Sequence, residues 1–62
     1  MTEIATIRFR HAETSDEAVA IVRRDEKNVA LCLSLKSNAD VEVVMTKQHA
    51  KRLLDALERA VA

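Results

Sequence analysis

The segment Val41-Glu-Val-Val-Met45 runs through Thr46 straight into Lys47-Gln-His-Ala-Lys-Arg-Leu-Leu-Asp-Ala-Leu-Glu-Arg-Ala-Val61. The first part has the alternation of a strand, and the second has the period of an amphipathic helix. At about 100° per residue, the apolar side chains of the helix fill one arc of roughly 160°, and charged side chains fill most of the rest. Thr46 belongs to a residue type that caps helix N-termini. The apolar arc consists of Ala50, Leu53, Leu54, Ala56, Leu57, Ala60 and Val61.

Two earlier stretches also alternate as half-buried strands do, and each has one side richer in large apolar residues. In residues 4–10 that side carries Ala5, Ile7 and Phe9, and the opposite side carries Ile4, Thr6, Arg8 and Arg10. In residues 29–36 it carries Val29, Leu31, Leu33 and Leu35, and the opposite side carries Ala30, Cys32, Ser34 and Lys36. The sequence therefore predicts two strands with one strongly apolar face.

Residues 18–24 fit two interpretations. Thr14-Ser-Asp-Glu17 before an Ala-rich run is typical of a capping box that opens a helix, whereas Ala18-Val-Ala-Ile-Val22 is rich in β-branched residues that favour a strand. We predict a strand, followed by a turn over residues 25–28 in which Asn28 takes the left-handed conformation. A second turn is expected over residues 37–40, with Asn38 in the same role.

These segments predict a single α+β domain over residues 1–62. Its small antiparallel sheet has three or four strands and is followed by one C-terminal amphipathic helix packed on one face, in the order ββββα. Leu57, near the middle of the apolar arc, is expected to face Leu33 and Val43.

The size of the chain favours association with a second copy. For 62 residues, apolar burial and conformational entropy each amount to roughly 90 kcal/mol, so the net stability of one copy is near zero. Chains this small usually gain stability from a disulfide, a metal or another subunit. The single cysteine cannot form an internal bridge, and no paired Cys or His spacing suits zinc. We therefore expect a homodimer without a metal or a cofactor.

Two surfaces are candidates for the dimer interface, and the sequence does not rank them. On the sheet face that the helix leaves open, Ile4, Ala30, Cys32 and Val44 would otherwise lie in water. On the shoulder of the helix, His49, Ala56 and Ala60 would permit close approach of another helix.

Four arginines, Arg8, Arg10, Arg23 and Arg24, are candidate contacts to nucleic-acid phosphates. Ten basic residues balance ten acidic ones, which removes the general attraction for nucleic acid. Phe9, the single aromatic residue, is expected on the face opposite Arg8 and Arg10, where it cannot stack bases for them. We expect solvated arginines at strand ends, some of them paired with Glu42 or Asp25.

The leading hypothesis is a non-enzymatic, homodimeric protein-interaction module that is used as a small regulator or protein inhibitor. Phage-encoded regulators and inhibitors are included in this class. Its expected partners are itself and an unidentified protein. The alternative is a single-stranded nucleic-acid-binding protein that uses the four arginines. The first eight residues hold charges and no apolar run, so we expect a cytoplasmic protein without a membrane anchor.

The run Val-Glu-Val-Val-Met-Thr-Lys-Gln-His-Ala-Lys-Arg-Leu-Leu over residues 41–54 resembles, in outline, the single-stranded-DNA-binding transcriptional coactivators. The resemblance implies four strands, then a helix, and a dimer. It transfers no functional residue, because the basic and aromatic groups of that family's binding face are missing from this chain.

Overall fold

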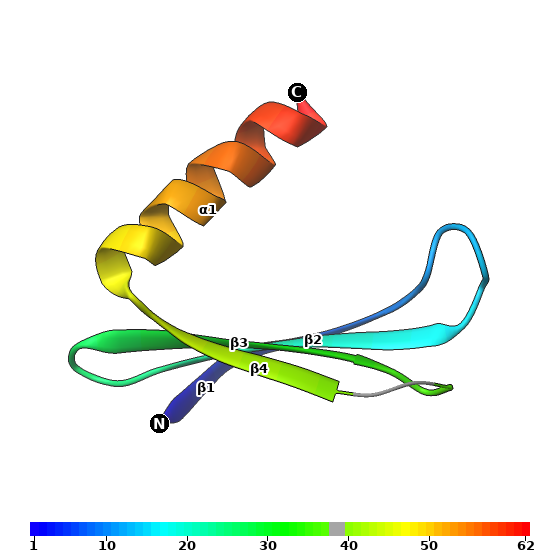
Figure 1. Cartoon of the computed structure of the whole chain (residues 1–62), viewed down its shortest axis with the longest axis horizontal. Coiled ribbons are helices and arrows are strands. Elements are labelled where there is room, and N and C mark those ends of the chain that lie inside the picture. Colours follow the sequence, from blue (N-terminus) through cyan, green and yellow to red (C-terminus); the bar gives the residue numbers. More distant parts are fainter. Residues whose placement is uncertain (38–39) are drawn as a thin grey trace.

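The computed structural model describes residues 1–37 and 40–62, and it contains one antiparallel sheet followed by one helix (Figure 1). The strands pair in chain order, β1-β2-β3-β4, so each hairpin joins neighbouring strands. The predicted ββββα fold class is confirmed, and residues 18–24 belong to a strand as predicted. The elements are β1 (Thr2–Arg10), β2 (Glu17–Arg24), β3 (Asn28–Leu35), β4 (Asp40–Thr46) and α1 (Lys47–Val61).

The turn between β2 and β3 is held by the side chain of Asp25. Its Oδ1 accepts hydrogen bonds from the backbone N–H of Lys27 at 2.9 Å and of Asn28 at 2.8 Å. These two bonds favour the charged carboxylate and lower the pKa of Asp25 below its ordinary value of 3.8. The prediction that Asn28 takes the left-handed conformation is wrong, because Ser15 is the only described residue with a positive φ. The prediction for Asn38 lies outside the described residues.

The loop between β1 and β2 contains this left-handed Ser15, with φ at 66°. The N–H of Ser15 donates to the carbonyl of His11 at 2.9 Å, and the N–H of His11 donates to the carbonyl of Asp16 at 2.8 Å. The guanidinium of Arg10 adds a bond to the Ser15 carbonyl at 3.0 Å. Backbone and side-chain bonds thus close this loop without a glycine.

Strand β4 passes into α1 without an intervening loop, as the sequence predicts. Thr46 is extended, with φ at −67° and ψ at 158°, and its hydroxyl accepts a hydrogen bond from the N–H of His49 at 3.2 Å. This bond satisfies one of the N–H groups that the first turn of a helix leaves free. Thr46 is therefore both the last residue of the sheet and the cap of the helix.

The strand register divides the sheet into two chemically different faces. Residues paired across an antiparallel sheet lie on one face, and successive residues of a strand alternate between faces. What we call the apolar face carries Ala5, Ile7, Phe9, Ala18, Ala20, Val22, Val29, Leu31, Leu33, Leu35, Val41, Val43 and Met45. What we call the mixed face carries Glu3, Thr6, Arg8, Arg10, Glu17, Val19, Ile21, Arg23, Ala30, Cys32, Ser34, Asp40, Glu42 and Val44.

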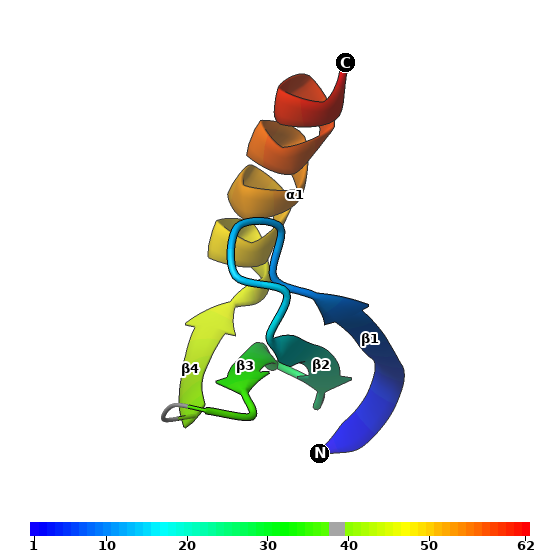
Figure 2. The same ribbon diagram turned by 90° about the vertical axis from the view of Figure 1, so that its right-hand side faces the viewer.

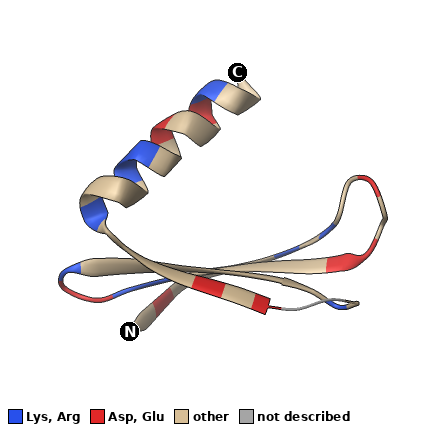
Figure 3. Ribbon diagram, viewed as in Figure 1, with Lys and Arg blue, Asp and Glu red and all other residues tan. Residues whose placement is uncertain are grey.

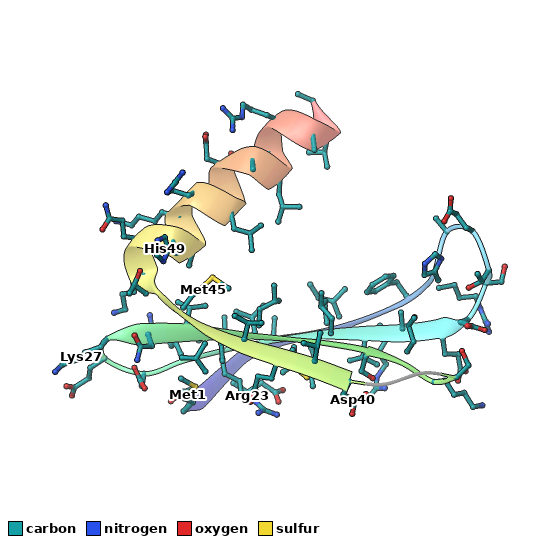
Figure 4. All side chains as sticks on the ribbon, in the orientation of Figure 1. Met1, Arg23, Lys27, Asp40, Met45 and His49 are labelled. Atoms are coloured by element: carbon teal, nitrogen blue, oxygen red, sulfur yellow. The ribbon has the colours of Figure 1, made fainter. Side chains whose placement is uncertain are left out.

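Helix α1 stands on the side of the apolar face and rises away from it along its length (Figures 1 and 2). Met45 lies on this side of the sheet and Arg23 on the other (Figure 4). The helix contacts β3 and β4 but not β1 or β2. The expectation that Leu57 is buried against Leu33 and Val43 of the same chain is wrong, because the three side chains are 55%, 43% and 52% exposed. Helix periodicity predicts which side is apolar but does not fix the angle at which the helix leaves the sheet.

Candidate interaction surfaces

The apolar face is largely open to solvent within one chain. Ile7 is 54% exposed, Phe9 48% and Val41 54%, and among the described residues only Ala18 and Ala30 are buried apolar residues. The open face includes a hollow of about 290 Å³ whose lining includes Phe9, Ala18, Leu33, Leu35 and Val41, with His11 beside it. Exposed contiguous apolar surface of this kind marks an interaction site.

The apolar arc of α1 is the second open surface. Leu54 is 58% exposed and Val61 83% exposed, and no described residue of the helix is buried. The closest approach to the sheet is at the start of the helix, where Ala50 and Leu54 line a hollow with Val29 and Arg24. Beyond this point no element among the described residues covers the arc. Two apolar surfaces, one on the helix and one on the sheet, are therefore exposed on the same side of the molecule.

On the mixed face, an ion pair crosses the central strand. Nη1 of Arg23 on β2 lies 3.2 Å from Oε2 of Glu42 on β4, and β3 lies between these strands. Ala30 pairs with Arg23 in the register and lies on the same face. Its methyl group leaves room for the two long side chains, and Ala30 is only 1% exposed. The predicted pairing of a strand-end arginine with Glu42 is confirmed.

The four residues of the candidate sheet interface do not all lie together on one exposed surface. Ala30, Cys32 and Val44 share the mixed face as predicted. Val44 is 54% exposed and Cys32 is half-buried, but Ala30 lies beneath the ion pair. Ile4, 54% exposed, lies at an irregularity between Glu3 and Ala5, where it has no partner in β2. Because of this bulge Glu3, rather than Ile4, shares the face of Thr6, to whose hydroxyl it is bonded at 2.8 Å.

The candidate helix shoulder remains an exposed surface. His49, Ala56 and Ala60 are all exposed. His49 is in the first turn, near the joint between β4 and α1 (Figure 4). The backbone of His49 is used by the Thr46 cap, whereas Ala56 and Ala60 lie further along the helix. These two alanines border the larger leucines of the arc.

The four candidate arginines do not form one basic surface. Arg8 and Arg10 lie on the mixed face of β1, and Arg23, at the other end of that face, is paired with Glu42. Arg24 pairs in the register with Val29 and so belongs to the opposite face. Arg10 is bonded to its own loop. Basic and acidic residues are also mixed along the helix and over the β2–β3 turn (Figure 3).

A hollow beside Arg8 and Arg10 is the nearest feature to a polar site. Its lining also includes Glu17, Ser34 and Lys36. Lys36 Nζ lies 3.3 Å from Glu17 Oε2, and both side chains are mostly exposed. Within residues 1–37 and 40–62, no group of three or more His, Cys, Asp or Glu is arranged to hold a metal ion. No helix in the same ranges has the length and apolarity needed to span a bilayer.

Sequence reasoning missed the openness of the apolar face and the contribution of β2 to the mixed face. Ile7, Phe9 and Leu33 lie on the strongly apolar sides that the alternation predicts, but they are surface residues in one chain. Val19 and Ile21 lie on the mixed face, opposite Ser34 and Cys32. The alternation of β2 could have placed this pair, because Val19 and Ile21 have the opposite parity to Ala18 and Ala20.

No protein family, curated protein or solved structure matches this chain.

Proposed function

We propose that this chain is a homodimeric protein-interaction module that acts by binding, as a small regulator or inhibitor, and not by catalysis. The observation that carries the proposal is the exposed surface area of one copy. A folded chain of 6.9 kDa should expose about 4,000 Å², whereas this chain exposes 5168 Å², a surplus of roughly 1,200 Å². Two copies that bury this surplus would form an interface of about 2,400 Å² in total, within the range of obligate homodimers.

The composition of the open surface supports the same proposal. Obligate interfaces resemble a domain core cut in half, and the apolar face with the helix arc has this character. Ile7, Phe9 and Leu57 are each about half exposed in one chain. A monomer would leave these groups in water at a cost of about 25 cal/mol per Å² of apolar surface.

The alternative, a single-stranded nucleic-acid binder, has less support. Binding to a phosphate backbone requires a continuous basic groove, usually with aromatic stacking groups. Arg23 is neutralised by Glu42, and Arg24 lies on the opposite face from Arg8. Phe9 lies on the apolar face, away from Arg8 and Arg10.

Sedimentation equilibrium tests the proposed dimer. The wild-type protein should sediment with the mass of two 6.9 kDa chains. Leu57→Arg places a charge in the helix arc and should shift the protein towards the monomer or unfold it. Val44→Arg is the matched control, since Val44 and Leu57 are 54% and 55% exposed but Val44 lies on the mixed face. A wild-type protein that is folded and monomeric at every concentration would refute the proposal.

Affinity chromatography on single-stranded DNA separates the two candidate functions. We expect no retention at physiological salt. Retention that weakens steeply with added salt, and that is lost in Arg8→Ala, would favour the nucleic-acid alternative, because phosphate contacts release counterions.

A further inference from the structure

The apolar arc of α1 is wider than contact with one sheet requires. A helix that packs on a single neighbour needs an apolar stripe of about 100°, and the arc here covers roughly 160°. One margin of the arc is formed by Leu54 and Val61, and the other by Ala56 and Ala60. An arc of this width has room to contact two neighbouring elements at once.

The apolar face is likewise larger than its own helix can cover. Helix α1 contacts only β3 and β4, which leaves the β1 side of the face open. Ile7 and Phe9 of β1 are 54% and 48% exposed. The β1–β2 loop rises on the same side as α1, so helix and loop stand at opposite ends of this face (Figures 1 and 2). The uncovered region therefore lies between α1 and the sheet of the same chain.

A second copy of α1 has the right chemistry for this region. It is apolar over a wide arc, so that one side can face the sheet and another side can face the first helix. A helix is about 10 Å in diameter, and 15 residues span roughly 22 Å. The described part of each chain includes one such helix and one such open region. If two copies related by a two-fold axis exchange their helices, the open regions of both copies are covered and the assembly is closed.

We propose that α1 of a second copy lies between α1 and the apolar face of the first, and that the exchange is reciprocal. This inference rests on the proposed homodimer and specifies how it is built. The two helices lie side by side between two sheets, and each contacts the partner's helix and the partner's β1. The charged residues of each helix stay at the margins of the assembly, where Arg59 Nη2 and Asp55 Oδ2 are 3.6 Å apart. The mixed face of each sheet points outward.

An isotope-filtered NOE experiment on the wild-type protein tests this arrangement. Phe9 is the only Phe, Tyr or Trp in the chain, so its ring protons identify one position on the apolar face. One batch is deuterated with protonated Phe, and the other carries ¹³C-methyl Leu and Val. The batches are unfolded together and refolded. Intermolecular NOEs from the Phe9 ring to methyl groups of Leu53, Leu54 or Leu57 are expected.

The possible results separate the arrangement from the dimer itself. A dimer by sedimentation that shows no NOE between Phe9 and the partner's helix would refute the reciprocal exchange while leaving the homodimer intact. A helix that closed on its own sheet would give the same absence of intermolecular NOEs and would also refute the exchange. A folded monomer would refute both proposals.

Cross-linking gives a second test that does not depend on spectral quality. In a Cys32→Ser background, Ile7→Cys chains are refolded with Leu57→Cys chains and treated with a short bismaleimide. The mixed pair should cross-link efficiently. The matched control pair, Val44→Cys with Leu57→Cys, should cross-link at least tenfold less, because Val44 points outward. Equal yields from the two pairs would contradict the proposed arrangement.

Discussion

The guanidinium of Arg23 and the carboxylate of Glu42 meet 3.2 Å apart above β3, although their strands are not neighbours. The pair spans about 10 Å of sheet, twice the strand spacing. On the intervening strand Ala30, which pairs with Arg23 in the register, offers only a methyl group to the same face. The two side chains are 39% and 44% exposed, so the pair itself contributes at most about 1 kcal/mol. Ala30, on the same face, is 1% exposed.

Enlarging the residue below the ion pair should therefore destabilise the fold. Ala30→Val adds two methyl groups where Ala30 is 1% exposed, and overpacking of this kind costs about 1–3 kcal/mol. Urea unfolding at fixed protein concentration measures the change. The control is Ala12→Val, at an exposed position in the β1–β2 loop, which should change stability by less than about 0.5 kcal/mol. Equal effects of the two substitutions would contradict this explanation.

The Thr46 cap should contribute measurably to the stability of the helix. Thr46→Ala removes the oxygen that accepts the N–H of His49 at 3.2 Å, and loss of such a cap costs about 1 kcal/mol. Thr46→Ser keeps the hydroxyl and should recover most of the loss. Thermal unfolding followed by circular dichroism at 222 nm, the usual helix signal, provides the measurement. If Thr46→Ser and Thr46→Ala have the same melting temperature, the hydroxyl does not stabilise the helix.

Asp25 should make folding depend on pH in the acid range. Its pKa in the folded protein is lowered below 3.8 by the bonds from Lys27 and Asn28. The stabilisation is therefore fully present above the unfolded value and is lost as pH falls through the lowered folded pKa. An NMR titration of the Asp25 carboxyl carbon should give a midpoint below 3.8.

The substitution Asp25→Asn provides the comparison for that titration. It keeps an acceptor oxygen for the two backbone N–H groups but has no charge to titrate. The variant should lose less stability on acidification than the wild type, whereas Glu26→Gln, a neighbouring exposed residue, should behave like the wild type. A midpoint for Asp25 at or above 3.8 would be inconsistent with the hydrogen bonds described here.

The elements of the fold were predictable because their patterns are local. Alternation over residues 41–45 and a helical period over residues 47–61 specify β4 and α1, and β-branched Val19, Ile21 and Val22 decide the strand in β2. The positive φ of Ser15 and the bulge at Ile4 were not predictable. Both depend on hydrogen bonds and register that only the assembled hairpin provides.

The candidate surfaces were predictable in composition but not in exposure. The alternation of side chains along the strands correctly predicted that Cys32 and Val44 lie on one face. The burial of Ala30 required the alignment of three strands, which periodicity does not give. The exposure of Phe9 depends on the direction of α1, and in the proposed dimer the second copy completes that contact.

Thermal unfolding over a range of protein concentrations shows whether a second copy completes the fold. If unfolding and dissociation are coupled, the melting temperature should rise steadily between about 1 and 100 µM protein. Leu57→Arg should lower the melting temperature at every concentration, whereas Val44→Arg should follow the wild-type dependence. A wild-type melting temperature that is independent of concentration, in a protein that sediments as a monomer, would contradict the account.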